Sequence, residues 1–302
     1  MDNVLHIIRM VFSPITMLFR FINDYFKVFV LFLIVIVLLA SNGEISEIDT
    51  SNLYKVYLDE EIADIKDLKN EIKELIEADN IKGVLFVVNS PGGFVSESTE
   101  LSELIQRLNA VKPVVTYAYG SLTSGSYYAS IWSERIIANK GTIVGSIGVI
   151  LDGLNLKKVR DTIGIESQIV KAGEFKEAGT SDREWTKEER EELEKITNGF
   201  YSEFVNDVAI ARKLDITKQN EFANAHIFTA PQALSIGLID EIGIELLAEE
   251  RLMKLAKIPK SSAIWGETKE ENEDINILEN LMSSFVKGFL SELNSQNSFK
   301  LQ

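Results

Sequence analysis

The chain contains no cysteine, although it is 302 residues long. This absence excludes disulfide bonds, cysteine-ligated zinc and a catalytic thiol. Histidine is almost as scarce, since His6 and His226 are the only two. With so few histidines, and no carboxylate pair at metal-ligand spacing, we expect no metal site. No glycine motif for phosphate or dinucleotide binding is present either, so we expect no cofactor.

The chain is also short of positive charge. Its 31 Lys and Arg are outnumbered by 46 Asp and Glu, which gives a net charge of -15. Proteins that bind nucleic acid need a basic stripe to neutralise phosphates, so we expect no nucleic-acid partner. The apolar fraction of 45% and the charged fraction of 25% are ordinary for a globular protein.

One long apolar run lies near the N-terminus. Residues 28–40 contain no polar side chain, and Tyr25, Phe26 and Lys27 extend the run close to the ~17 residues that a membrane span needs. Basic residues precede it and acidic residues follow it, which predicts a cytoplasmic N-terminus and a translocated remainder. A cleaved signal peptide is the alternative, but no Ala-x-Ala processing pattern follows the run. We therefore predict an uncleaved single-pass anchor.

The chain divides into five predicted parts. These are an amphipathic cytoplasmic segment (1–24), a transmembrane anchor (25–41), a linker (42–54), a folded domain (55–270) and an amphipathic tail (271–302). Inside the folded domain, apolar runs alternate with stretches of helical spacing, which predicts an α/β fold with right-handed crossovers. We expect strands at 55–58, 83–88, 113–118, 135–138, 142–150 and 167–170, and helices at 62–78, around 101–108, from 124, from 186 to about 214, at 231–236 and at 245–256.

Two glycine-containing turns follow predicted strands, at the positions where α/β folds collect ligands. The first is Ser90-Pro-Gly-Gly93, and the second is Ser124-Gly125 at the start of a helix. Backbone N–H groups of Gly93 and Gly125 could hold an oxyanion that forms beside a reacting Ser124. Each turn also has a simpler interpretation, as a plain tight turn and as a helix N-cap.

A serine nucleophile needs a base, and histidine offers little choice. His6 precedes the apolar run, and we interpret His226 as a structural or exposed residue. A lysine can replace histidine in a Ser–Lys dyad, and we choose Lys176, which lies on a glycine-flanked loop. A lysine acts as a base only when neutral, and burial favours the neutral form. Ser146 is a candidate partner for the amine.

The carboxylates next to this lysine set a condition on the hypothesis. A nearby negative charge favours the ammonium form over the neutral amine. Glu174 and Glu177 flank the chosen lysine in sequence. The hypothesis therefore requires both side chains to point away from the amine.

Five segments together resemble the bacterial signal peptide peptidase family. These membrane-anchored Ser–Lys proteases share a fold with the Clp protease and crotonase proteins, and this chain resembles the short, single-repeat type. The segments follow the family's order, span roughly residues 55–264, and lie at 88–93, 124–129, 142–149, 171–176 and 233–243. The resemblance implies Ser124 as nucleophile, Lys176 as general base, Gly93 at the oxyanion hole and Ser146 beside the lysine amine.

The chain departs from the family pattern at two places. The family usually has Ser-Gly-Gly-Tyr-Tyr, and Ser126 here replaces the second glycine, which would cost energy if that position needed a positive φ. The family also usually has Gly-Arg and an aromatic residue where this chain has 225–228. We expect that region to lie away from the dyad and to change packing or oligomer contacts.

The predicted function is that of a membrane-anchored serine endopeptidase that hydrolyses signal peptides and other apolar peptides after their release. The resemblance implies a bacterial inner-membrane protein with an extracytoplasmic domain and a homo-oligomeric ring, in which serine meets the lysine of a neighbour. A catalytically silent, peptide-binding membrane scaffold of the same fold is the alternative, motivated by Ser126. A crotonase-like acyl-CoA enzyme is a third possibility, which the lack of a basic phosphate-binding cluster opposes.

Overall fold

A computed structural model describes residues 25, 26, 28, 30, 31 and 50–267. Contacts divide the chain into two units, residues 1–50 and 51–302. Within the described residues, no helix is both long and apolar enough to span a membrane. Most of the expected anchor, and all of the expected amphipathic segments at both ends, lie outside the described residues.

The second unit is built around one sheet, whose strands run in the order β6-β5-β3-β2-β1-β8. The pairing between β5 and β6 is antiparallel, and the other pairings are parallel. Strand β4 pairs with both β3 and β7 beside that path. The strands are β1 (Leu53–Leu58), β2 (Val84–Ser90), β3 (Val114–Thr123), β4 (Arg135–Ala138), β5 (Ile143–Gly145), β6 (Ile227–Thr229), β7 (Glu241–Ile242) and β8 (Trp265–Glu267).

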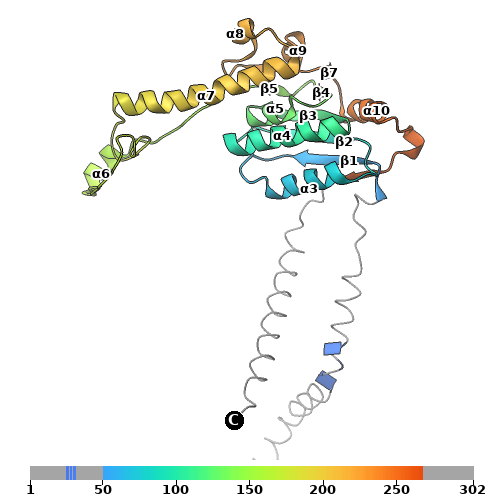
Figure 1. The fold of residues 1–302 in the computed structure, drawn as a ribbon, viewed down its shortest axis with the longest axis horizontal. Coiled ribbons are helices and arrows are strands. Elements are labelled where there is room, and N and C mark those ends of the chain that lie inside the picture. The colour runs from blue at the N-terminus through green and yellow to red at the C-terminus, as the bar shows by residue number, and fades with distance from the viewer. Residues whose placement is uncertain (1–24, 27, 29, 32–49, 268–302) are drawn as a thin grey trace, which may run out of the picture. The chain divides into compact units, whose positions relative to one another are not determined.

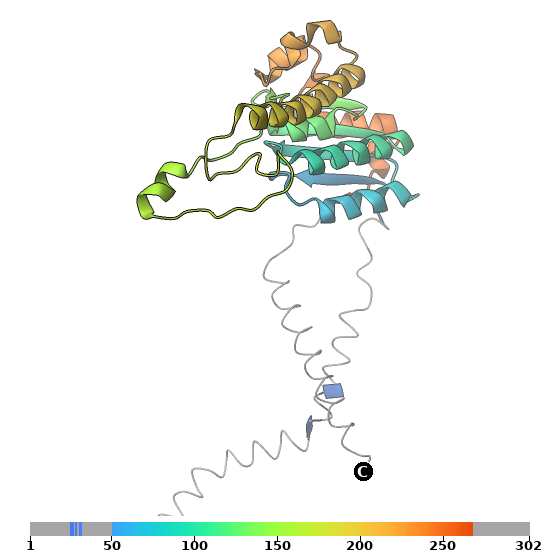
Figure 2. The same cartoon turned by 60° about the vertical axis from the view of Figure 1, so that its left-hand side comes forward.

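Helices cover this sheet, and α3 and α4 run side by side along it (Figures 1 and 2). Helix α10 packs through Ala248, Leu252 and Met253 against strand residues that include Leu85 and Val115. The helices are α3 (Lys66–Glu77), α4 (Val95–Val111), α5 (Gly125–Ser130), α6 (Lys157–Ile163), α7 (Lys187–Arg212), α8 (Gln219–Phe222), α9 (Ala230–Ser235) and α10 (Glu245–Ala256), with short 3-10 turns at Ile216–Lys218 and Lys260–Ser262. The predicted α/β class is therefore confirmed.

Strand β2 is central because its residues are apolar on both faces. Its first five residues are all buried, as expected for a strand covered by helices on both sides. Strand β3, its neighbour, is longer and changes partner along its length. Residues 115–118 of β3 pair with β4, and residues 121–123 pair with β5. This change of partner extends β3 to Thr123, directly before the candidate nucleophile.

Most predicted elements are confirmed, with differences at their ends. The predicted helix over 62–78 begins later, at Lys66, because Ile62 forms a parallel bridge with Gly93. The predicted strand over 142–150 ends at Gly145, because Gly145 and Ser146 both have a positive φ, of 112° and 51°. The capping box that opens α7 at Thr186 is confirmed, with Glu189 as its partner.

The predicted strand at 167–170 is wrong, because those residues form no strand. They belong to a segment, residues 151–186, that we call the arm. Figures 1 and 2 show the arm at the end of α7, where α6 and its flanking loops project away from the sheet. No residue of the arm is buried. A strand needs a partner for its backbone groups, and 167–170 pair with none of the strands that the structure describes.

Candidate active site

The candidate nucleophile Ser124 lies on a sharp turn between β3 and α5. Its backbone has φ 55° and ψ -124°, a conformation that side chains with a Cβ rarely adopt. Two hydrogen bonds hold this turn, since Ser124 N donates to Gly145 O at 2.8 Å and Ser124 O accepts from Tyr128 N at 3.0 Å. Strain of this kind persists where the surrounding structure fixes it, and strained strand-to-helix turns expose catalytic serines in other hydrolases.

The second predicted turn, Ser90-Pro-Gly-Gly93, lies against the first. A Cβ on Gly92 would approach Gly125 N to 2.5 Å, and a Cβ on Gly93 would approach Ile62 O to 2.1 Å. Both distances are below any normal contact, so only glycine fits at these two positions. The parallel strands β2 and β3 end at the same edge of the sheet, and the two turns consequently meet there.

A cavity of about 40 Å³ opens where the turns meet. Ser124, Gly93 and Gly125 line it together. Among the described residues, the N–H groups of Gly93 and Gly125 have no hydrogen-bond acceptor, so both are free to bind a negatively charged oxygen. The remaining wall is mostly apolar and includes Val95, Tyr128, Val149, Phe200 and Phe204. A hydroxyl beside two free donors is suited to acyl transfer.

Ser126 has a role that the sequence did not reveal. It is helical and fully buried, and the positive φ in this turn belongs to Ser124. Its hydroxyl proton is shared between Ser90 O at 2.7 Å and Thr123 O at 2.9 Å. The same Oγ accepts a hydrogen bond from Thr123 N at 2.9 Å. Ser126 therefore fastens the first turn to the second, and the expected backbone penalty does not arise.

Ser146 lies on the strand edge next to the nucleophile. It follows Gly145, which accepts the hydrogen bond from Ser124 N, and its own N–H donates to His226 O at 2.7 Å. The expectation that 225–228 lies away from the site is therefore wrong, because β6 pairs with β5 directly beside it. The imidazole of His226 is exposed, lies 6.2 Å from the ring of Phe228 and does not line the cavity.

Lys176 is placed apart from the other predicted site residues. It is exposed on the arm, where its backbone N–H bonds to Gly173 O at 3.3 Å, and it does not line the cavity. One chain thus gathers Ser124, Gly93 and Gly125 at the cavity and Ser146 close by, but it does not bring Lys176 to them.

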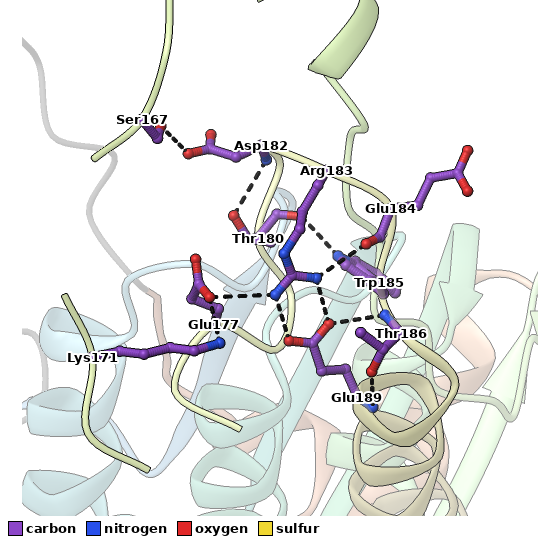
Figure 3. Close-up of polar contacts among 10 residues, drawn as sticks. All are labelled: Ser167, Lys171, Glu177, Thr180, Asp182, Arg183, Glu184, Trp185, Thr186 and Glu189. Atoms are coloured by element: carbon purple, nitrogen blue, oxygen red, sulfur yellow. Dashed lines mark hydrogen bonds and ion pairs between the residues drawn. The ribbon is translucent and has the colours of Figure 1, made fainter. Parts of the chain in front are cut away.

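The arm is held by its own charged network, shown in Figure 3. Arg183 binds both carboxylate oxygens of Glu189 at 2.7 Å and reaches Glu177 at 3.4 Å. Glu177 also pairs with Lys171, so two cations other than Lys176 engage its carboxylate. The hydrogen bonds from Arg183, and next the backbone N–H of Thr186, lower the pKa of Glu189 to about 2. The network thereby ties the arm to the start of α7.

Comparison with known proteins identifies the family. The sequence profile of peptidase family S49 matches residues 106–259. The chain belongs to peptidase family S49. The match covers α5 with Tyr128, the arm and α7, and it ends just after α10.

Relatives from other organisms extend this similarity. A Methanocaldococcus jannaschii protein provisionally named as a protease is 40% identical over 63% of this chain and 61% of its own length. An Enterococcus faecium protein provisionally named signal peptide peptidase SppA is 32% identical over 76% of this chain and 66% of its own length. The chain spans less than two thirds of each relative. A solved structure of a Listeria monocytogenes ClpP1 variant aligns with 65% of this chain and 92% of its own length, at 16% identity and a TM-score of 0.43.

Proposed function

We propose that this S49 family member is a serine endopeptidase with Ser124 as nucleophile. The observation that supports it best is the position of Ser124, on a strained turn that faces two unpaired N–H donors in one cavity. The apolar wall of that cavity favours apolar peptides, and we propose signal peptides released at the membrane as substrates.

The reaction follows from these positions. Ser124 Oγ attacks the peptide carbonyl while Lys176 takes its proton, and the Gly93 and Gly125 N–H groups stabilise the oxyanion. The lysine ammonium then gives the proton to the leaving amine, which breaks the C–N bond and leaves an acyl-enzyme. Water, activated by the same lysine, releases the acyl group. Ser146 is proposed to hydrogen-bond the lysine amine.

The separation of the dyad supports an oligomer. Because the arm holds Lys176 away from the cavity of its own chain, we propose that the partner subunit's Lys176 completes each site. Head-to-tail contacts of this kind form a ring when the rotation between subunits closes, and a ring is the assembly that we propose. We further propose that the N-terminal apolar run anchors the subunits in a bacterial inner membrane, with the catalytic domain outside the cytoplasm.

Mixing two inactive variants tests both the residues and the oligomer. Ser124→Ala and Lys176→Ala are each expected to lose cleavage of a fluorogenic peptide. When the two are co-assembled in equal amounts, about a quarter of the interfaces join an intact serine to an intact lysine, so about a quarter of the wild-type rate should return. A silent mixture would refute the shared site. Full activity of Lys176→Ala alone would refute the lysine, and His226 would become the next candidate.

The scaffold alternative makes a different prediction. It rested on Ser126, whose conformation leaves the turn intact. A serine-directed fluorophosphonate should label the assembled wild type at Ser124 and leave Ser124→Ala unlabelled. If the wild type takes no label and cleaves nothing, the protein is a peptide-binding scaffold.

A further inference from the structure

Ser98 carries a buried hydroxyl that the fold does not use. The residue lies in the first turn of α4 and is 3% exposed. Among the buried side-chain nitrogen and oxygen atoms of the described residues, its Oγ is the one that lacks a hydrogen-bond partner. Buried polar atoms are nearly always paired, because an unpaired one costs stability. An exception of this kind calls for an explanation in terms of function.

The neighbours of Ser98 on α4 show that pairing is possible in this environment. Ser102, one turn further along the same helix and 2% exposed, donates to Tyr128 O at 2.9 Å. Thr99 donates to Val95 O, one helical turn back, at 2.8 Å. The hydroxyl of Ser98 is therefore an exception on its own helix.

The position of this hydroxyl is close to the proposed oxyanion hole. A Cβ built on Gly125 would lie 2.1 Å from Ser98 Oγ and 3.2 Å from Gly93 N. Ser98 Oγ and Gly93 N therefore both lie close to Gly125. Ser98 also lines the cavity that contains Ser124. A space of about 40 Å³ admits a water molecule or a small group of a bound peptide.

We propose that Ser98 is a further catalytic residue, whose Oγ–H donates a hydrogen bond to the oxyanion beside the Gly93 and Gly125 N–H groups. The inference rests on the proposed peptidase function. A hydroxyl without a partner gives up no existing bond when it turns toward the developing charge. An interaction made only in the transition state changes kcat and leaves KM unaltered.

Two matched variants separate this role from a structural one. Ser98→Ala removes the unpaired hydroxyl and should lower kcat about 100-fold, the effect of losing one oxyanion donor. Its KM should be unchanged, and its melting temperature should be equal to or higher than that of wild type. Ser102→Ala removes a paired hydroxyl from the same helix and should lower the melting temperature while leaving kcat within about threefold of wild type. If Ser98→Ala keeps the wild-type kcat, the proposal is wrong.

A transition-state analogue provides a second measurement. A peptide boronate should bind wild type more tightly than Ser98→Ala by the factor seen in kcat, while binding to Ser102→Ala stays unchanged. Equal boronate affinity in wild type and Ser98→Ala would overturn the proposal, whatever rate the variant shows in turnover assays, because equal binding shows that its site is folded. Measurements on the wild type separate the two hypotheses. If the wild type is inactive and takes no label, the peptidase function is refuted, and the role of Ser98 with it. If wild type and Ser98→Ala are equally active, only the role of Ser98 is refuted.

Discussion

Replacing Ser126 by alanine should loosen the contact between the two catalytic turns. The change removes the proton shared by Ser90 O and Thr123 O and the acceptor of Thr123 N–H. One net hydrogen bond contributes about 1 kcal/mol, and stranding a buried N–H costs about 1–3 kcal/mol. The expected loss is therefore about 2–4 kcal/mol, because Ser126 and Ser90 are fully buried and water cannot replace the bonds.

Thermal unfolding followed by circular dichroism measures this loss. A domain of this size shifts by about 2–4 °C for each kcal/mol, so Ser126→Ala should melt about 4–16 °C below wild type. Ser130→Ala is the matched control, because Ser130 is equally buried in α5 but only bonds back to Ser126 O within the helix. A Ser126→Ala melting temperature within 2 °C of wild type would refute the role of this hydroxyl.

Three further changes have defined outcomes. Gly125→Ala should abolish cleavage, because its Cβ would meet Ser98 Oγ at 2.1 Å, and intact activity would disprove that proximity. The free energy of unfolding of Ser124→Gly should exceed that of Ser124→Ala by about 1 kcal/mol or more, because glycine tolerates φ 55°. Equal stability of the two variants would contradict the strain. The pKa of Glu189 is lowered from 4.5 to about 2, so its bonds stabilise the start of α7 above pH 4.5 and are lost as pH falls through about 2. Hydrogen exchange of the Glu189 and Arg190 amides, which both donate to Thr186, should show that loss in wild type. In Arg183→Leu the same two amides should exchange quickly already at pH 5.

The sequence predicts elements well where local pattern decides them. The apolar run of β2 and the Thr186 capping box both carry their structural cause within a few residues. The meeting of the Gly93 and Ser124 turns is also predictable, because parallel strands place their ends at one edge of a sheet.

Other features depend on contacts between distant parts of the chain. The late start of α3 depends on a bridge between Ile62 and Gly93. The tie between Ser126 and Ser90 spans 36 residues, and no local pattern indicates it. Residues 167–170 have strand-like composition, but the described part of the chain offers no strand for them to pair with. A local loop motif indicates Lys176, but it does not indicate that the arm holds this residue away from the cavity.

The two parts of the proposed dyad depend on different forces. Ser124 adjoins a sheet whose apolar core is insensitive to ions, whereas Lys176 lies on an arm without buried residues, held by pairs such as Lys171–Glu177. Ionic strength near 1 M shortens the Debye length to about 3 Å and weakens exposed pairs of this kind. Salt should therefore loosen the lysine-bearing arm while the serine turn keeps its shape, and dilution should restore the arm without refolding the sheet.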